Sequence, residues 1–151
     1  MADNPELNPN ITPDNPYNTA QHIAKTRKAK LAALTGYWGL FILVPLWHIV
    51  LAPHPDISLG FLLTIWWLPL FLPMHGLIKG KPYTYAWVNF ITLFYVLHSL
   101  TMIYAEPTER VLAIIEFLLA CVFFTGACYY ARWQGQYLGL GLKKNKDKTA
   151  R

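Results

Sequence analysis

Four apolar stretches, each about twenty residues long, most constrain what this chain can fold into. They cover residues 31–51, 59–77, 85–104 and 111–130. A helix rises about 1.5 Å per residue, so such a stretch spans the roughly 30 Å hydrocarbon core of a bilayer. The alternative, a soluble bundle, requires polar faces at helical spacing, and residues 61–72 and 111–124 offer none. The sequence therefore predicts an all-α, four-pass transmembrane helical bundle.

The positive charges lie on one side of this predicted bundle. They precede the first stretch, separate the second from the third and follow the fourth: Lys25, Arg27, Lys28, Lys30, Lys79, Lys81, Arg132 and the Lys and Arg residues of 143–151. The two remaining loops, residues 52–58 and 105–110, contain only Arg110. Because Lys and Arg favour the cytoplasmic side of short loops, we expect both termini in the cytoplasm.

This charge distribution also bears on partners. The cationic face is expected to lie against a bilayer with anionic headgroups. A nucleic-acid partner is not predicted, because neither tail contains base-reading or stacking elements. Residues 1–24 are predicted to be a disordered Asn/Pro-rich cytoplasmic tail, residues 25–135 the transmembrane domain, and residues 136–151 a basic cytoplasmic tail. Thr19 is expected to cap a helix that carries the first basic run into the bilayer.

Aromatic residues and prolines mark further features of the spans. An interfacial belt is expected on the basic side from Tyr83, Tyr85, Trp87, Tyr129, Tyr130 and Trp133, and on the other side from Trp47 and Tyr104. Pro45, Pro69 and Pro73 fall inside the first two spans, where each removes a backbone donor. The carbonyls that they free must find partners in neighbouring helices or side chains.

Glu116 is an acid inside the most apolar stretch. A central charge costs roughly 3 kcal/mol on insertion scales, and the surrounding Leu, Ile, Phe and Val residues offset it, so the span should still insert. With both termini on one side, helical rise brings other polar residues to within about 5–9 Å of the same membrane surface. The predicted polar layer contains His48, Thr64, His98, Ser99 and Glu116.

This layer has two interpretations. In the structural one, a neutral Glu116 is hydrogen-bonded to His98 or Ser99 and joins the last two helices, with an interaction typically worth about 0.6 kcal/mol. In the functional one, Glu116 and the histidines carry protons or bind a metal. No diagnostic HEXXH or EXXH spacing supports a metal, and a haem held by His48 and His98 is less favoured because their depths differ.

Cys121 and Cys128 are about 10 Å apart on one helix, too far for an internal disulfide. No metal or cofactor is predicted.

The loop between the second and third spans is the other candidate site. Glycines permit positive φ, a proline fixes the turn and lysines face the headgroups. The phosphate-loop pattern GxxxxGK[ST] is absent. The loop is predicted to be a rigid, positively charged hairpin, or a docking site for a partner or a lipid headgroup. Its candidate residues are His75, Gly76, Lys79, Gly80, Lys81, Pro82, Tyr83, Thr84, Trp87 and Arg132.

Two segments carry a resemblance to a known family: PLFLPMHGLIKGKPYTYAWVNFITLFYVLHSL and ERVLAIIEFLLACVFFTGACYYAR. Their recurring features are a loop at Gly76 and Gly80–Thr84, Ala86-Trp87, Tyr95 with His98, Glu109-Arg110, Glu116, and Tyr130 with Arg132. Over roughly residues 31–132 the chain resembles the small four-helix inner-membrane proteins of proteobacteria catalogued as a domain of unknown function (DUF2069). The resemblance implies a bacterial inner-membrane location and brings no activity with it.

These observations favour a non-enzymatic membrane protein that acts as an accessory or scaffold to a membrane or peripheral protein partner. The alternative is a small proton-coupled carrier or a metal or ligand sensor that uses the buried layer. A membrane enzyme is the least supported reading, because no nucleophile, phosphate cradle or metal triad occurs at diagnostic spacing.

Overall fold

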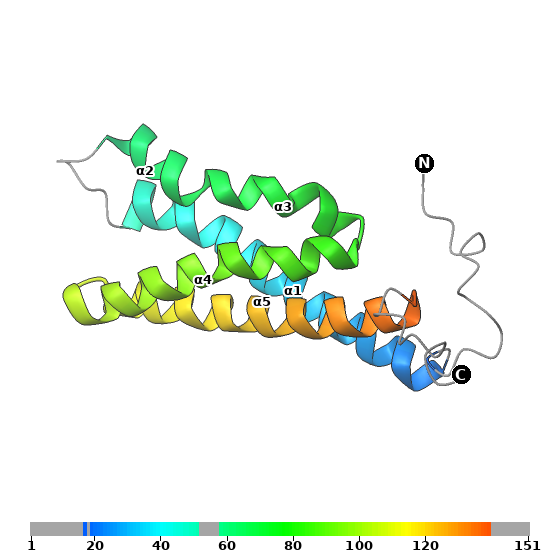
Figure 1. Ribbon diagram of the computed structural model, residues 1–151. Coiled ribbons are helices and arrows are strands. Elements are labelled where there is room, and N and C mark those ends of the chain that lie inside the picture. The colour runs from blue at the N-terminus through cyan, green and yellow to red at the C-terminus, as the bar shows by residue number, and fades with distance from the viewer. Residues whose placement is uncertain (1–16, 18, 52–57, 140–151) are drawn as a thin grey trace, which may run out of the picture.

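The computed structural model describes residues 17, 19–51 and 58–139, and this part of the chain is helical with no strand (Figure 1). The elements are α1 (Ala20–Leu46), a π-helical turn (Trp47–Leu51), α2 (Leu59–Trp66), α3 (Leu68–Ile78), α4 (Pro82–Ala105) and α5 (Arg110–Tyr137). They form segments long and apolar enough to cross a membrane: Ala20–Leu51, Leu59–Ile78, Pro82–Ala105 and Arg110–Tyr137. The predicted all-α, four-pass architecture is confirmed.

The helices extend beyond the predicted apolar stretches at one end of the bundle. α1 begins directly after Thr19, so residues 20–24, predicted to belong to a disordered tail, form its first turns. At the other end of the chain α5 continues to Tyr137. The predicted tails over residues 1–16 and 140–151 lie outside the described residues, as do positions 18 and 52–57.

The two ends of the bundle differ in charge. At one end α1 begins, α3 turns into α4 and α5 ends, and every described Lys and Arg except Arg110 lies there; we call it the basic end (Figure 1, right). The opposite end, which we call the far end, holds the π-helical turn, the start of α2 and the turn from α4 to α5. The described carboxylates, Glu106, Glu109 and Glu116, all lie at or near it.

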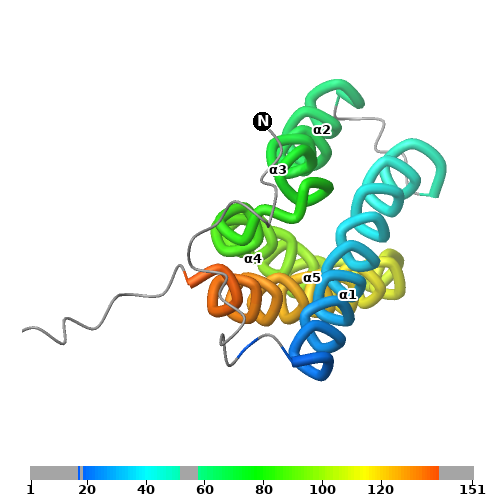
Figure 2. Tube along the Cα trace, turned by 90° about the vertical axis from the view of Figure 1, so that its right-hand side faces the viewer, coloured from blue at the N-terminus to red at the C-terminus, as the bar shows by residue number. Residues whose placement is uncertain are grey.

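α5 is the central helix of the packing. It contacts both α1 and α4 along their lengths, while α2 and α3 lie on the other side of α1 and α4 (Figure 2). Small residues allow the closest approach of α1 and α5. A Cβ at Gly126 would lie 2.5 Å from the backbone nitrogen of Ala33, and one at Gly36 would lie 2.6 Å from that of Phe123. Small residues at such contacts are typical of membrane helix pairs.

Side chains from neighbouring helices satisfy the backbone groups that the prolines expose. Pro45 has no N–H to donate to the carbonyl of Phe41, and the Trp67 indole N–H donates to that carbonyl instead (3.1 Å). Before Pro69 the second span breaks at Trp67, and the Tyr95 hydroxyl donates to the Trp66 carbonyl (2.6 Å). The prediction that freed carbonyls find partners in other helices is confirmed for Pro45. At the second break Tyr95 bonds a neighbouring carbonyl, which is left open because the Leu70 N–H donates to Trp67 instead of Trp66.

Candidate functional site

Near the far end, Glu116 of α5 faces His98 of α4. His98 Nδ1 lies 2.9 Å from Oε2 and 3.2 Å from Oε1 of the carboxyl group. The Glu116 side chain is 1% exposed and that of His98 13%. Either an imidazole N–H donates to the carboxylate or a carboxyl O–H donates to Nδ1, and both arrangements satisfy the buried acid. The interhelical hydrogen bond predicted between Glu116 and His98 is confirmed.

Aromatic rings from the first two spans cover this pair. The ring centroids of Trp66 and His98 are 3.8 Å apart, and those of Trp47 and His98 are 5.8 Å apart. Trp47 is itself buried, and its indole N–H donates to Oε2 of Glu109 at 2.7 Å. The acid and its histidine are therefore enclosed by all four spans and tied through Trp47 to the start of α5.

The other members of the predicted polar layer do not join this pair. Thr64 is exposed, and its hydroxyl donates to the Gly60 carbonyl of its own helix. Ser99 is buried but donates to the Val96 carbonyl rather than to Glu116, so that alternative partner is wrong. His48 is buried, and because a carbonyl can only accept, its Nδ1–H donates to the Val44 carbonyl at 2.9 Å. These residues lie at similar depth along the bundle, but their side chains leave their helices in different directions and do not meet.

Trp47, Trp66 and Glu109 are parts of this cluster that sequence reasoning did not assign to it. Trp47 was expected in an interfacial belt, and it is buried because its indole N–H has a partner in Glu109. Sequence position could have indicated their place in the cluster, because Trp47 is adjacent to His48 at the end of the first apolar stretch and Glu109 opens the fourth. Tyr104, the other residue expected in that belt, is 91% exposed.

At the basic end, the turn from α3 to α4 is a rigid hairpin built by its own sequence. Gly80 has φ +70°, and the N–H groups of Gly80 and Lys81 donate to the carbonyls of Leu77 (3.1 Å) and Gly76 (3.0 Å). This pattern is a Schellman motif, which needs a left-handed residue and therefore favours glycine. Pro82 then occupies the first turn of α4, where its missing N–H has no helical partner to lose.

Close packing and two tyrosines fix this hairpin to the bundle. A Cβ at Gly76 would overlap the buried Thr84 side chain, so α3 and α4 meet there. The hydroxyls of Tyr85 and Tyr130 donate to the carbonyls of Leu77 (2.9 Å) and Gly80 (2.8 Å). Tyr85 and Tyr130 were expected at the membrane interface, and both are buried instead because their hydroxyls have these backbone partners.

The remaining residues of the predicted loop site point away from the packing. His75, Lys79, Lys81, Tyr83 and Arg132 are exposed, and Trp87 is half-buried. Beside the hairpin, a cleft of about 270 Å³ opens between α1 and α5. Its lining includes His22, Arg27, Lys30 and Tyr130, and neither ring nitrogen of His22 has a hydrogen-bond partner among the described residues. Lys30 lies 6.0 Å from the centroid of the Tyr130 ring and thus links this cleft to the hairpin.

No three His, Cys, Asp or Glu side chains of the described residues gather in a way that could hold a metal ion. Both cysteines are free, and Cys128 accepts a hydrogen bond from the Asn89 amide at 3.2 Å.

Comparison with known proteins identifies a family. The family model described as "Predicted membrane protein (DUF2069)" matches residues 32–135. That match covers the second and third spans, most of the first and fourth, the His98–Glu116 pair and the hairpin. No curated protein and no solved structure matches the chain.

Proposed function

This chain belongs to the DUF2069 family of predicted membrane proteins, and from that premise we propose that it is a non-enzymatic accessory or scaffold protein. It resides in the bacterial inner membrane with both termini in the cytoplasm, where the basic end docks an acidic segment of a membrane or peripheral protein. The observation that carries this proposal is the hairpin at the basic end, which is rigid, exposed and cationic.

The geometry of the hairpin supports docking in two ways. Its backbone is fixed by the Schellman motif and by the tyrosine hydroxyls, so little conformational entropy is lost when a partner binds. Its charges are also available, because Lys79 and Lys81 are exposed and all described carboxylates lie toward the far end. A cationic surface of this kind favours partners with complementary negative charge.

Partner recovery tests this proposal. We expect the Lys79→Gln/Lys81→Gln variant and the Tyr83→Ala variant to lose most of the protein recovered by cross-linking from intact membranes. Tyr104→Ala is the matched control, because Tyr104 is highly exposed like Tyr83 (91% and 79%) but lies at the far end. Glu116→Gln is expected to leave recovery intact. Unchanged recovery in both hairpin variants would contradict docking at the basic end.

The orientation is tested separately with reporter fusions. Reporters of cytoplasmic location fused at residue 1 and at residue 151 should both be active, and reporters of periplasmic location should both be silent. A difference between the two ends would overturn the placement of the basic end in the cytoplasm.

The buried His98–Glu116 pair favours a second candidate function, a proton-coupled carrier or a metal or ligand sensor. On this hypothesis His98→Ala or Glu116→Gln abolishes function while the protein still inserts at normal levels. The enclosure of the pair by Trp47 and Trp66 makes it the weaker candidate, since a carrier needs access to its proton site. Proton flux in liposomes and metal analysis of purified protein distinguish it from a scaffold, and negative results in both would exclude it.

A further inference from the structure

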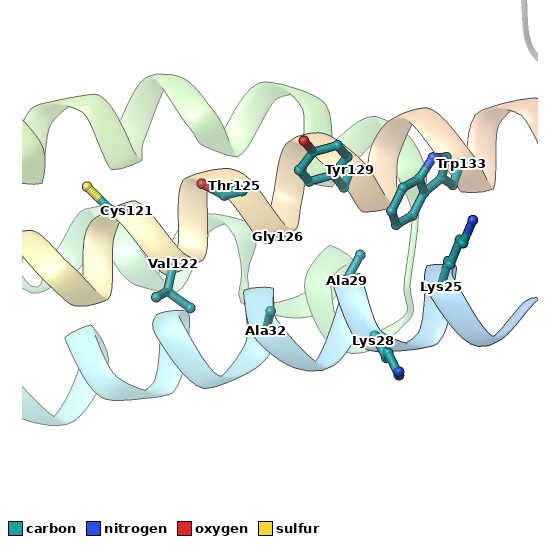
Figure 3. A pocket seen from close by; sticks show the side chains of 10 residues that line it. All are labelled: Lys25, Lys28, Ala29, Ala32, Cys121, Val122, Thr125, Gly126, Tyr129 and Trp133. Atoms are coloured by element: carbon teal, nitrogen blue, oxygen red, sulfur yellow. The ribbon is translucent and has the colours of Figure 1, made fainter. Parts of the chain in front are cut away.

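A groove of about 520 Å³ runs along the surface between α1 and α5, in the half of the bundle nearer the basic end (Figure 3). It is separate from the hairpin and from the cleft beside it. Its lining residues are Lys25, Lys28, Ala29, Ala32, Cys121, Val122, Thr125, Gly126, Tyr129 and Trp133.

The groove exists because residues without long side chains form its floor. Ala29 and Gly126 lie where α1 and α5 come into contact, so nothing fills the space above them. On α5, Val122 and Tyr129 are 44% and 49% exposed, and the rings of Tyr129 and Trp133 stack at 5.0 Å. The result is an open, apolar channel on a surface that faces hydrocarbon in a membrane.

The length of the groove corresponds to one leaflet. From Cys121 to Trp133 the axial distance is about 18 Å at helical rise. Half of a bilayer's hydrocarbon core is about 15 Å thick, and Tyr and Trp favour the interface at its edge. The groove therefore runs from the interface to about the middle of the membrane, which matches one lipid chain rather than a spanning helix.

Charge is present only at the interfacial end of the groove. Lys25 and Lys28 line it on α1, at the end where Trp133 lies on α5 (Figure 3). Both lysines are exposed, and the described carboxylates lie toward the opposite end of the bundle. An apolar channel with two lysines at its interfacial end complements a molecule with a hydrocarbon tail and an anionic head.

We propose that this groove binds one anionic phospholipid. An acyl chain lies over Ala29, Ala32 and Gly126, and the headgroup phosphate is held by Lys25 and Lys28. This site is independent of the proposed docking at the hairpin, which lies on a different face and uses other lysines.

Native mass spectrometry of the purified full chain tests the site. Phosphatidylglycerol and phosphatidylcholine with identical acyl chains are added separately, and the fraction of protein that keeps one lipid is measured. We expect clear preference for phosphatidylglycerol. Lys25→Gln/Lys28→Gln should reduce its affinity by roughly fivefold per lysine, or about 25-fold in total. The affinity for phosphatidylcholine should fall much less, because its choline cation offsets the charge of its phosphate. Lys79→Gln/Lys81→Gln removes the same charge from the same end and should change affinity less than twofold.

A second variant tests the acyl channel. Ala32→Phe fills the groove, and it should weaken retention of both lipids while circular dichroism shows unchanged helix content. Equal retention of the two lipids by the unmodified chain, or equal losses in the two lysine variants, would overturn the proposal. Disulfide cross-linking of Ala32→Cys between two chains in membranes, in a background with Cys121→Ser and Cys128→Ser and undiminished by added phosphatidylglycerol, would assign the groove to a second copy instead.

Discussion

The two ends of the bundle differ in where their polar and charged side chains find partners. At the far end polar side chains face one another inside the protein: His98 contacts Glu116, and Trp47 donates to Glu109. At the basic end the buried hydroxyls of Tyr85 and Tyr130 bond to the backbone, and the lysines of the hairpin stay exposed. A buried polar group that is hydrogen-bonded within the chain contributes to stability, whereas an exposed charge on a rigid turn is free to contact another molecule. The far end is therefore expected to control stability and the basic end to control binding.

The largest effect on stability is expected from Glu116→Ala. Removing the carboxyl leaves the largely buried His98 ring without its partner, which costs about 2 kcal/mol in the free energy of unfolding. Glu116→Gln keeps a hydrogen-bonding side chain of the same shape and should cost less than about 1 kcal/mol. Denaturant titration in detergent micelles measures both values. An alanine variant as stable as the unmodified chain would show that the pair does not hold α4 to α5.

A smaller loss is expected from Gly76→Ala at the basic end. The added methyl group overlaps Thr84 and should cost about 1–2 kcal/mol by overpacking α3 against α4. Gly135→Ala is the matched control, because a Cβ there meets nothing within 4 Å. Gly76→Ala should also speed hydrogen exchange of the Lys81 N–H, which donates to the Gly76 carbonyl. Equal stability of the two alanine variants would mean that the hairpin is not tightly packed.

Trp47→Phe probes the link between the π-helical turn and the start of α5. The change keeps the ring but removes the N–H that donates to Glu109, and it should cost about 1 kcal/mol. Trp38→Phe serves as the comparison, since Trp38 is 41% exposed and no hydrogen bond of its indole is seen among the described residues. The difference between the two variants, measured by the same titration, isolates the Trp47–Glu109 hydrogen bond. If the two losses are alike, the cluster at the far end does not extend to Glu109.

The same contrast explains what the sequence could predict. Apolar length determined the four spans, and helical rise from a common surface brought His98 and Glu116 to the same depth. Gly80 and Pro82 specify their turn locally, so the hairpin was also predictable. Depth contains no information about rotation, which is why Thr64 and Ser99 were placed in a layer that they do not join. Tyr85, Tyr130 and Trp47 were assigned to interfaces because the carbonyls and the carboxylate that accept from them become neighbours only after folding.

The smallest effect on stability is expected from Lys79→Gln/Lys81→Gln, and it is the sharpest test of the comparison. Both side chains are exposed, and the described carboxylates lie toward the other end of the bundle, so the free energy of unfolding should change by no more than about 0.5 kcal/mol. The same variant should lose most of its partner recovery from membranes. Glu116→Ala should show the reverse, with lower stability but with partner recovery retained in the fraction that remains folded. If the lysine variant were instead destabilised by as much as Glu116→Ala, the hairpin charges would be engaged within the protein, and the division between a stabilising end and a binding end would fail.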